Sequence, residues 1–492
     1  MTDVRPVTVI VLAAGAGTRM KSRTSKLLHE IGGRTLIGHA LAAARGIAPD
    51  QLVAVTGHER EQVEAHIRAA APDVALAVQE EQNGTGHAVQ CGLAAVDDTT
   101  SGTIVVTYGD VPLLESATLQ ALVDDHCSAG RAVSILTAEV DDPAGYGRIV
   151  RESDGGVTRI VEHKDATDAD HAIREINSGI FAFDAAYLSS ALDRIGSDNT
   201  QGEIYLTDMV EIAVGDGRTV GAHVLDDVWQ TEGVNNRLQL ATLGAELNRR
   251  TLRHCMLDGV TIVDPTSTWV DVTVSLSSDV TLLPGVQLHG ETTVATGACV
   301  GPDTTLTDVR VGEYAQVVRA HAYGAEIGRD AAVGPFAYLR PGTTLGTSAK
   351  VGTYVETKNT RLAAGAKVPH LSYVGDGDIG EGANVGAGTI FANYDGVNKH
   401  PTTIGAQART SSNNTFVAPV TVGPGAFTGA GATIREDVPP GALAVTAGPQ
   451  RTIDGWVHKR RPGTPAADAA RAAEADERDV VHTDTAVTSD EE

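Results

Sequence analysis

Short apolar runs alternate with amphipathic stretches through the first half of the chain. The apolar runs are rich in β-branched residues and read VTVIVLAA, LVAVTG, VALAVQ, TIVVTYGD, VSILTAEV and GIFAFD. Between them lie helical patterns such as EREQVEAHIRAAA and TLQALVDDH. Strands that alternate with helices are typical of a largely parallel sheet covered on both faces. We therefore predict an α/β domain over residues 1–235, with its ligands at the carboxyl ends of the strands.

A connecting helix is predicted next, over residues 236–256. The segment NRLQLATLGAELNRRTLRH carries Leu at helical spacing, and Gly244 is its single Gly or Pro. The alternation of strands and helices ends with this segment.

An aliphatic residue recurs at every sixth position within residues 257–460. The evenly spaced positions are Leu282, Leu288, Val294, Val300 and Leu306, then Ile327, Val333, Leu339, Leu345 and Val351, and then Ile404, Thr410, Phe416, Val422, Thr428 and Ile434. This spacing is typical of a β-helix, in which each six-residue unit forms one flat side of a coil around a buried aliphatic column. The phase slips after Leu306 and again between HLSYVGDGDIG and FANYDGVNKH. We expect loops to leave the solenoid at both places.

The chain is strongly acidic, which limits its partners. It holds 38 Lys plus Arg against 63 Asp plus Glu, a net charge of -25. This charge argues against general affinity for nucleic acid or membrane, so small anionic ligands need local basic pockets. Residues 461–492 are rich in acidic residues and lack aromatic ones, and we expect them to form a disordered tail.

The cysteines and the N-terminal segment indicate the cellular compartment in which we expect the protein. The four cysteines have neither metal nor redox spacing, so we expect reduced and mostly buried thiols: Cys91, Cys127, Cys255 and Cys299. The N-terminal apolar run ends in a glycine turn, unlike a signal peptide or a spanning helix. We expect a cytoplasmic protein.

The first strand runs into a glycine turn that cations follow. In VLAAGAGTRMKSRTSK, Gly15 and Gly17 allow backbone N–H groups to meet an anion closely. A Rossmann fingerprint would need a third glycine at Met20, and a Walker loop would need a Gly-Lys-Ser/Thr sequence that is absent. The glycine turn is therefore predicted to bind phosphate, but it belongs to neither of these two loop types.

The whole string from Leu12 to Met20, followed by Lys26, resembles the signature of sugar-1-phosphate nucleotidyltransferases. The resemblance implies that Leu12, Ala13, Ala14, Gly15 and Lys26 bind a nucleotide triphosphate. It also implies that Arg19 and Lys26 neutralise charge on the departing pyrophosphate.

Further matches to this family follow in order along the chain. QEEQNGTGHA resembles its base-recognising turn, which implies that Gln79, Gly84 and Thr85 contact uracil. TYGDVP ends a strand and implies nucleotide contacts from Tyr108, Gly109 and Asp110. GYGRIV, VEHKDA, INSGI and GVNNRLQL resemble the sugar-binding elements, with contacts from Gly147, Glu162, Asn177 and Asn235. Asp110 and Asn235 would together hold Mg²⁺, which prefers oxygen ligands.

A six-residue repeat alone leaves three functions open: an acyltransferase, a zinc enzyme, or an oligomerisation domain. Arg340 interrupts an apolar repeat and Lys358 follows it, so we expect an anion near these cations. His370, in KVPHLSYVGD, could take a proton from an attacking amine. A three-histidine cluster suited to zinc is not apparent in the repeat.

PHLSYVGD, NVGAGT and NYDG resemble the acetyltransferase domain of the bifunctional N-acetylglucosamine-1-phosphate uridyltransferase/glucosamine-1-phosphate acetyltransferase family. The resemblance covers residues 7 to about 460. It implies a Rossmann-like domain, a linker helix and a left-handed β-helix that assembles as a homotrimer. Its implied substrates are UTP, N-acetylglucosamine 1-phosphate, glucosamine 1-phosphate and acetyl-coenzyme A. The product, UDP-N-acetylglucosamine, would feed cell-envelope synthesis.

The same resemblance assigns residues of the second site. His370 is the implied general base. The implied contacts to the amino-sugar phosphate and acceptor site are Arg340, Lys358, Tyr373, Asn384, Asn393 and Tyr394, and those to acetyl-coenzyme A are Ala387, Ser412 and Ala430.

The sequence departs from the family pattern at three positions. Ser25 stands where proline is common, Ser411 replaces a usual glycine, and Ala447 stands where many relatives have an arginine. We hypothesise that Arg451 or Lys459 replaces that arginine at the cofactor. Two alternatives stay open at this point: a nucleotidyltransferase whose β-helix serves assembly alone, and a sugar-nucleotide sensor without catalysis.

Overall fold

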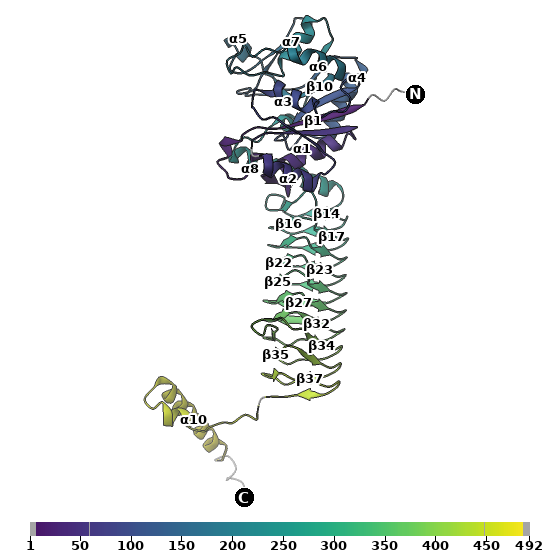
Figure 1. Cartoon of the computed structure of the whole chain (residues 1–492). Helices are drawn as coiled ribbons and strands as arrows, with labels where there is room; N and C mark the ends of the chain where they lie inside the picture. The colour runs from purple at the N-terminus through teal and green to yellow at the C-terminus, as the bar shows by residue number, and fades with distance from the viewer. Residues whose placement is uncertain (1–5, 59, 447, 486–492) are drawn as a thin grey trace.

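A computed structural model describes residues 6–58, 60–446 and 448–485 of the chain. An α/β domain stands at one end of a long column of stacked coils, and two C-terminal helices follow beyond the last coils (Figure 1). Among the described residues, no helix is both long and apolar enough to cross a membrane.

The N-terminal domain is built on a mixed sheet in which one strand of the main path runs against the others. The strand order is β11-β7-β10-β6-β1-β4-β5, with β8 and β9 attached to β10. The strands are β1 Val7–Ala13, β4 Gln51–Thr56, β5 Ala75–Val78, β6 Thr103–Tyr108, β7 Val133–Glu139, β8 Arg148–Arg151, β9 Val157–Val161, β10 Glu175–Asp184 and β11 Val220–Leu225. Only β10 among the seven strands of the main path is antiparallel to its neighbours. The predicted mostly parallel sheet is thus confirmed.

Helices cover both faces of this sheet. Along β1, Val9 and Val11 join one apolar cluster, whereas Ile10 and Leu12 join the other. The helices are α1 Leu36–Arg45, α2 Arg60–Ala70 and α4 Ser116–Ser128 on the first side, and α3 Thr85–Leu93, α6 Ala185–Ala191 and α7 Asp208–Gly215 on the second. Because both faces of β1 are buried, its sequence is a continuous apolar run rather than an alternating one.

Smaller elements complete the domain. They are η1 Thr18–Met20, η2 Lys26–Leu28, the hairpin of β2 Glu30–Ile31 with β3 Arg34–Thr35, α5 Asp168–His171, η3 Leu192–Arg194 and η4 Val228–Thr231.

Helix α8, Arg237–Leu257, joins the domain to the coils. The Asn236 side chain caps it by accepting a 2.9 Å hydrogen bond from the Gln239 N–H. Leu243 packs in the N-terminal domain, whereas Leu252 belongs to the core of the coils. The linker helix therefore shares its buried side chains with both domains.

The C-terminal half is a left-handed parallel β-helix with three flat faces. The first face stacks β12 Thr261–Ile262, β15 Thr281–Leu282, β18 Cys299–Val300, β21 Gln316–Val317, β24 Ala332–Val333, β27 Lys350–Thr353 and β30 Lys367–His370, and further down β37 Phe427–Thr428 and β39 Leu443–Ala444. The second face stacks β13 Trp269–Val270, β16 Gln287–His289, β19 Thr305–Thr307, β22 Ala320–Tyr323, β25 Ala337–Leu339, β28 Glu356–Lys358, β31 Tyr373–Gly375, β33 Ile390–Ala392, β35 Thr415–Val417 and β38 Thr433–Ile434. The third face stacks β14 Ser275–Leu276, β17 Thr293–Val294, β20 Arg310–Val311, β23 Glu326–Ile327, β26 Thr344–Leu345, β29 Arg361–Leu362, β32 Gly377–Ile379, β34 Thr402–Ile404 and β36 Val420–Val422.

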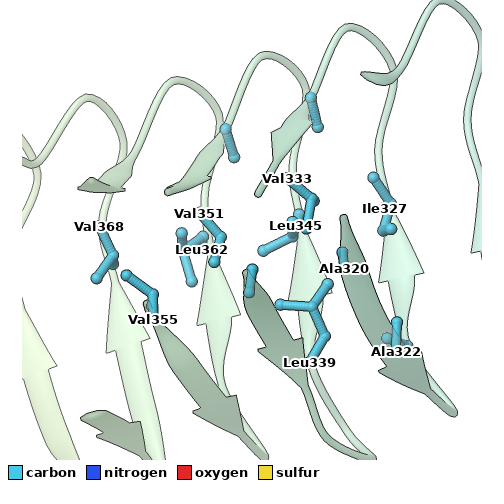
Figure 2. Close-up of a cluster of buried hydrophobic side chains, with 14 of the residues drawn as sticks. Ala320, Ala322, Ile327, Val333, Leu339, Leu345, Val351, Val355, Leu362 and Val368 are labelled. Carbon is cyan, nitrogen blue, oxygen red and sulfur yellow. The ribbon is translucent and has the colours of Figure 1, made fainter. Parts of the chain in front are cut away.

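The aliphatic residues of the repeat form the core of this β-helix. Figure 2 shows Val333, Leu339, Leu345 and Val351 pointing inward from successive strands. Each is at most 4% exposed. The six-residue spacing therefore predicted the buried column correctly.

The first phase slip has a different cause from the expected loop. Register partners on the second face lie 18 residues apart at Gln287 and Thr305 but 16 apart at Thr305 and His321. The coil is simply two residues shorter, and no loop leaves it. At the second slip, the first face pairs Asn384 with Arg409, 25 residues on, and a hairpin bridged at Tyr394 and Lys399 leaves the coil as expected.

The acidic tail is not wholly irregular, contrary to the expectation of disorder. Helix α9 spans Trp456–Arg460, and α10 spans Pro465–Thr485. Proline suits the first helical position, and alanine has the highest helix propensity of all residues. His458 lies 2.9 Å from the Glu474 carboxylate and ties the two helices together. The tail has too little apolar surface for a core, but its alanine content favours a helix.

Candidate functional site

A pocket of about 300 Å³ opens at the carboxyl ends of β1, β5 and β6. Ten of the predicted nucleotide residues line it: Leu12, Ala13, Ala14, Gly15, Lys26, Gln79, Gly84, Thr85, Tyr108 and Asp110. Gly109 is not among them, because it lies behind the pocket and its N–H donates to the Leu12 carbonyl at 2.9 Å. Segments that are far apart in sequence thus meet at one edge of the sheet.

The glycine turn folds back onto the cation that follows it. Gly17 has φ +58°, and a Cβ there would lie 2.6 Å from the Cβ of Lys26, so glycine is required. A Cβ on Gly15 would meet no atom within 4 Å, which leaves the backbone open to a ligand. Ser25, at the usual proline position, has φ -52°, within the range that proline would impose. The substitution therefore preserves the approach to Lys26.

The two predicted metal ligands each bind a predicted catalytic cation. Lys26 Nζ lies 2.5 Å from Asp110 Oδ2, and Arg19 Nη2 donates to Asn235 Oδ1 at 2.8 Å. The Val234 N–H donates to the Asp110 carbonyl at 2.9 Å, which holds Asn235 beside the carboxylate. Arg19 itself does not line the pocket.

These oxygens suit Mg²⁺ by their chemistry. One carboxylate and one amide oxygen are hard donors, and the ion would take its other ligands from phosphates and water. A bound ion would compete with Lys26 and Arg19 for these groups. Among the described residues, no group of three or more His, Cys, Asp or Glu side chains gathers as a metal cluster.

The turn predicted to read the base is held by internal hydrogen bonds. Gln79 Nε2 donates to the Gly84 carbonyl at 3.0 Å, and Thr85 Oγ1 accepts from the Leu206 N–H at 3.0 Å. Gln82 was missed, although its Nε2 donates to the Ala14 carbonyl at 2.7 Å and it lines the pocket. Its place within the same polar turn was the signal that could have found it. Leu27, Ala88 and Glu203 also line the pocket and were not predicted.

Three of the four predicted sugar residues meet where Gly147 precedes β8, Glu162 follows β9 and Asn177 lies on β10. A Cβ on Gly147 would lie 3.5 Å from Glu162 Oε2 and 3.6 Å from Asn177 Cβ. Burial raises the pKa of the Glu162 carboxyl, and the nearby carboxylates of Asp208, Asp165 and Glu203 add to this effect. A hydrogen bond from Thr207 opposes the shift. This part of the site presents acceptors suited to hydroxyl groups.

Tyr108 connects the sugar residues to the nucleotide pocket. Its ring packs on Gly179, where a Cβ would lie 2.3 Å from Cε2 of the ring. Asn177 Oδ1 accepts a hydrogen bond from the Gly179 N–H at 2.9 Å, which fixes this glycine beside the sugar residues. Burial raises the pKa of Tyr108, and the charges of Glu162 and Asp110 raise it further.

A second polar cluster lies on the second face of the β-helix. Arg340 Nη1 pairs with Glu356 Oε1 at 2.9 Å, and Glu356 is in register with Tyr373 on the next coil. A Cβ on Gly375 would lie 2.5 Å from both the Tyr373 hydroxyl and Asn393 Nδ2, so the absence of a side chain lets these two groups meet. Asn393 also donates to Asp376 at 2.6 Å.

Lys399 was not predicted, but it adds to this cluster. It lies beside Lys358, and the contact lowers the pKa of Lys358, first through a hydrogen bond and then through charge repulsion. Arg340 lowers the same pKa further. Three cations thus converge where the sequence predicted an anion. Tyr394 lies on the same hairpin as Lys399, and its hydroxyl donates to the Gly396 carbonyl at 2.6 Å.

His370 lies at the corner between the first and second faces. Backbone pairing and hydrogen bonds between successive coils stack one residue from each coil at this corner, in the order Thr353, His370, Ala387, Ser412 and Ala430. The predicted base and the three predicted cofactor residues thus form a single line, the corner column. Asn384 lies beside it on the first face, in register with Lys367 and Arg409.

Of the remaining departures from the family pattern, Ser411 lies next to this column. Ser411 is not among the residues of positive φ, so its position does not require glycine. Its N–H donates to Thr428 Oγ1 at 3.1 Å. Ala447 lies outside the described residues.

Comparisons with known proteins agree with this two-site arrangement. Residues 9–162 match the MobA-like NTP transferase domain family. The chain is 59% identical over 487 residues to the bifunctional protein GlmU of Micrococcus luteus, which covers 96% of this chain and 98% of that protein. It is 58% identical over 468 residues to GlmU of Kineococcus radiotolerans, and the match covers 95% of each protein. It is 56% identical over 482 residues to GlmU of Streptomyces coelicolor, and the match covers 97% of this chain and 100% of that protein. Since these relatives align over nearly their full length, the chain belongs to the family of bifunctional GlmU proteins.

Proposed function

We propose how this bifunctional enzyme of UDP-N-acetylglucosamine biosynthesis divides its two reactions between the two sites. The β-helix transfers an acetyl group from acetyl-coenzyme A to the amine of glucosamine 1-phosphate. The pocket on the N-terminal sheet then transfers UMP from UTP to N-acetylglucosamine 1-phosphate and releases pyrophosphate. The observation that carries this proposal is the presence of two separate polar sites, each with the charge that its substrates need.

For uridyl transfer, the sugar phosphate attacks the α-phosphorus of UTP. The Gly15 turn would receive the triphosphate, and Gln79 with Gly84 would receive uracil. Gly147, Glu162 and Asn177 would hold the sugar next to Tyr108. Mg²⁺ bound by Asp110 and Asn235 would offset the negative charge of both reacting phosphates.

Lys26 and Arg19 would change their hydrogen-bond partners during uridyl transfer. Lys26 and Arg19 now lie against Asp110 and Asn235. With a divalent ion held by Asp110 and Asn235, Lys26 and Arg19 would be able to turn to the triphosphate. They would then stabilise charge as it develops on the departing pyrophosphate.

For acetyl transfer, the amine of glucosamine 1-phosphate attacks the thioester carbonyl. His370 would accept the proton from the amine, a contribution of roughly 10²–10⁴ in rate. Arg340, Lys358 and Lys399 would hold the sugar phosphate through charge-assisted hydrogen bonds. The corner column would carry the acetylated arm of the cofactor next to His370.

A homotrimer through the β-helix is part of the proposal. Phe336 and Tyr354 stack at 5.4 Å and are 50% and 59% exposed, and Leu371 continues their line with 61% exposure. All three adopt positive φ, which costs of order 1–3 kcal/mol per residue when a side chain is present. An exposed apolar ridge held at such cost supports burial against another copy of the chain. Analytical ultracentrifugation would test it: a monomer at micromolar concentration would refute the trimer.

Two variants test the assignment of the sites. We expect Asp110→Ala to abolish the Mg²⁺-dependent release of pyrophosphate from UTP while acetyl transfer continues. We expect His370→Ala to slow acetyl transfer by at least about 10² while pyrophosphate release continues. Undiminished turnover in either variant would refute the role of that residue, and loss of both activities together would refute the division.

A further inference from the structure

A hydrogen bond joins the sugar side of the N-terminal site to its metal side. The Tyr146 hydroxyl donates to Glu232 Oε2 at 3.0 Å, although the two residues are 86 positions apart in the chain. Tyr146 directly precedes Gly147, one of the predicted sugar residues, and Glu232 stands three positions before Asn235, a predicted metal ligand. Neither Tyr146 nor Glu232 is among the predicted site residues, yet together they connect two parts of that site.

The segment that carries Glu232 is fixed beside Asp110. Glu232 follows η4, in which the buried Gln230 accepts a hydrogen bond from Thr118 Oγ1 at 2.7 Å. Two residues beyond Glu232, the Val234 N–H donates to the Asp110 carbonyl at 2.9 Å. Contacts on both sides of Glu232 therefore hold its backbone in place next to the metal ligands.

The backbone around Tyr146 is held by the strand that carries the sugar residues. The Asn177 N–H on β10 donates to the Gly147 carbonyl at 2.9 Å. Within the described part of the chain, the bond from Tyr146 is the only hydrogen bond that joins residues 140–151 to residues 228–236. It is thus the polar contact that sets the position of Gly147 relative to the metal ligands.

Burial and charge keep the Tyr146 hydroxyl a hydrogen-bond donor. Burial raises the pKa of Tyr146, and the charge of Glu232, the hydrogen bond to it and the charge of Asp110 raise this pKa further. The effect of Asp110 indicates that the phenol lies near the metal ligands as well as near Gly147. A hydroxyl that donates to a carboxylate forms a bond about twice as strong as one between neutral groups. The link is therefore suited to holding the end of a strand in position.

We propose that Glu232 is a positioning residue for uridyl transfer, which acts through Tyr146. By holding the Tyr146 hydroxyl, Glu232 fixes Gly147 relative to the two predicted metal ligands, so that the sugar phosphate lies in line with the α-phosphorus of UTP. The inference rests on the uridyl transfer proposed above and adds how the two halves of that site are kept aligned. A displacement of about 1 Å between reacting groups can lower a rate about 10²-fold. Loss of the link should therefore slow the chemical step, whereas substrate binding should change little.

Single-turnover kinetics at saturating substrate concentrations test the proposal. Tyr146→Phe and Glu232→Ala should each slow pyrophosphate release about 10²-fold. The steady-state KM values for UTP and N-acetylglucosamine 1-phosphate should stay within about threefold of wild type. Glu232→Gln should recover most of the rate, because its amide oxygen can still accept the hydrogen bond. The variant with both Tyr146→Phe and Glu232→Ala should be no slower than either single variant, because the two residues act as one unit.

Hydrogen exchange gives a readout that does not depend on catalysis. In the protein without metal or substrate, the backbone amides of residues 143–151 should exchange faster in Glu232→Ala than in wild type, because the loop has lost a contact that holds it. Glu232→Gln should exchange like wild type. Equal exchange in Glu232→Ala and wild type would overturn the positioning role.

Tyr187→Phe is the matched control. The Tyr187 hydroxyl donates to Asp216 Oδ2 at 2.9 Å. Tyr187 lines a cavity at the amino ends of β7 and β11, away from the carboxyl ends where the nucleotide pocket opens. This variant should therefore release pyrophosphate at the wild-type rate. Acetyl transfer should stay normal in every variant, which verifies folding.

The kinetic outcomes separate this proposal from the proposed function. Unchanged pyrophosphate release in Glu232→Ala would overturn the proposal, as would losses that add up in the double variant. A large rise in KM for N-acetylglucosamine 1-phosphate at an unchanged rate would overturn it in favour of direct contact with the sugar. If wild type released no pyrophosphate from UTP, the proposed function itself would fail.

Discussion

Replacement of Lys26 by glutamine should change metal binding and catalysis in opposite directions. Lys26 Nζ lies 2.5 Å from Asp110 Oδ2, and their side chains are only 10% and 20% exposed. A divalent ion that binds Asp110 competes with Lys26 for the charge of this carboxylate. Removal of the lysine therefore removes a competitor of the metal.

The size of the effect follows from the charges. Two unit charges 4 Å apart attract by about 4 kcal/mol at an effective dielectric constant of 20. The cost of exposing both groups again and a new amide hydrogen bond at position 26 offset most of this. We expect nucleotide-free metal affinity to rise about tenfold, which is about 1.4 kcal/mol. Uridyl transfer should fall by about 10²–10³, as when one stabilising donor is lost from a transition state.

The assay has two parts on the same protein samples. Electron paramagnetic resonance of free Mn²⁺ gives the affinity without nucleotide, with Asp110→Asn as the control that should bind weakly. Pyrophosphate release gives uridyl transfer, and acetyl transfer serves as the internal control for folding. Unchanged or weaker Mn²⁺ binding in Lys26→Gln would refute the competition, and intact uridyl transfer would refute the role at the triphosphate.

Three further predictions concern packing and protonation. Gly179→Ala should reduce uridyl transfer at least tenfold because its Cβ would overlap the Tyr108 ring. Gly130 also has a positive φ but has open space around it, so Gly130→Ala should lower stability alone. Steady-state kinetics of both variants decides this. The pKa of Glu162 is raised above 4.5, so the wild type loses stability as pH rises from 4.5 through the raised pKa. Glu162→Gln should therefore be more resistant to urea than wild type at pH 8 but not below pH 4.5, and equal differences at both pH values would contradict this. Phe416 is fully buried against Phe391 in the core of the β-helix. Phe416→Ala should therefore lower the stability of the β-helix by about 3–5 kcal/mol and depress acetyl transfer, while uridyl transfer measured in parallel stays normal.

The repeat made most of the β-helix predictable from its sequence. Leu339 and Val351 are buried because every sixth side chain of the repeat points inward. The six-residue period therefore identifies core residues directly from the sequence. The shortening of one coil between Thr305 and His321 was not predictable as such. A shorter coil and a loop disturb the period alike, and only backbone pairing tells them apart.

The antiparallel strand and the C-terminal helix show what local patterns miss. The apolar run GIFAFD of β10 does not differ in kind from the runs of the parallel strands, since burial on both faces favours apolar residues in either strand direction. In the tail, acidic composition argued for disorder, whereas alanine content favours α10.

The candidate sites were predictable where their residues belong to one segment. The turn from Leu12 to Lys26 carries its glycines and cations together, so the pocket could be inferred from the sequence. Lys399 lies 41 residues after Lys358, and nothing in the sequence near either residue indicates that the hairpin brings them together.

The central claim is that one chain holds two separable transferase sites, and product analysis of the complete reaction tests it most directly. Wild type, Asp110→Asn and His370→Gln would each receive glucosamine 1-phosphate, acetyl-coenzyme A, UTP and Mg²⁺, with products separated by anion-exchange chromatography. Wild type should form UDP-N-acetylglucosamine, Asp110→Asn should accumulate N-acetylglucosamine 1-phosphate, and His370→Gln should form neither but should convert added N-acetylglucosamine 1-phosphate. Accumulation of the intermediate by His370→Gln, or its absence from Asp110→Asn, would contradict the account.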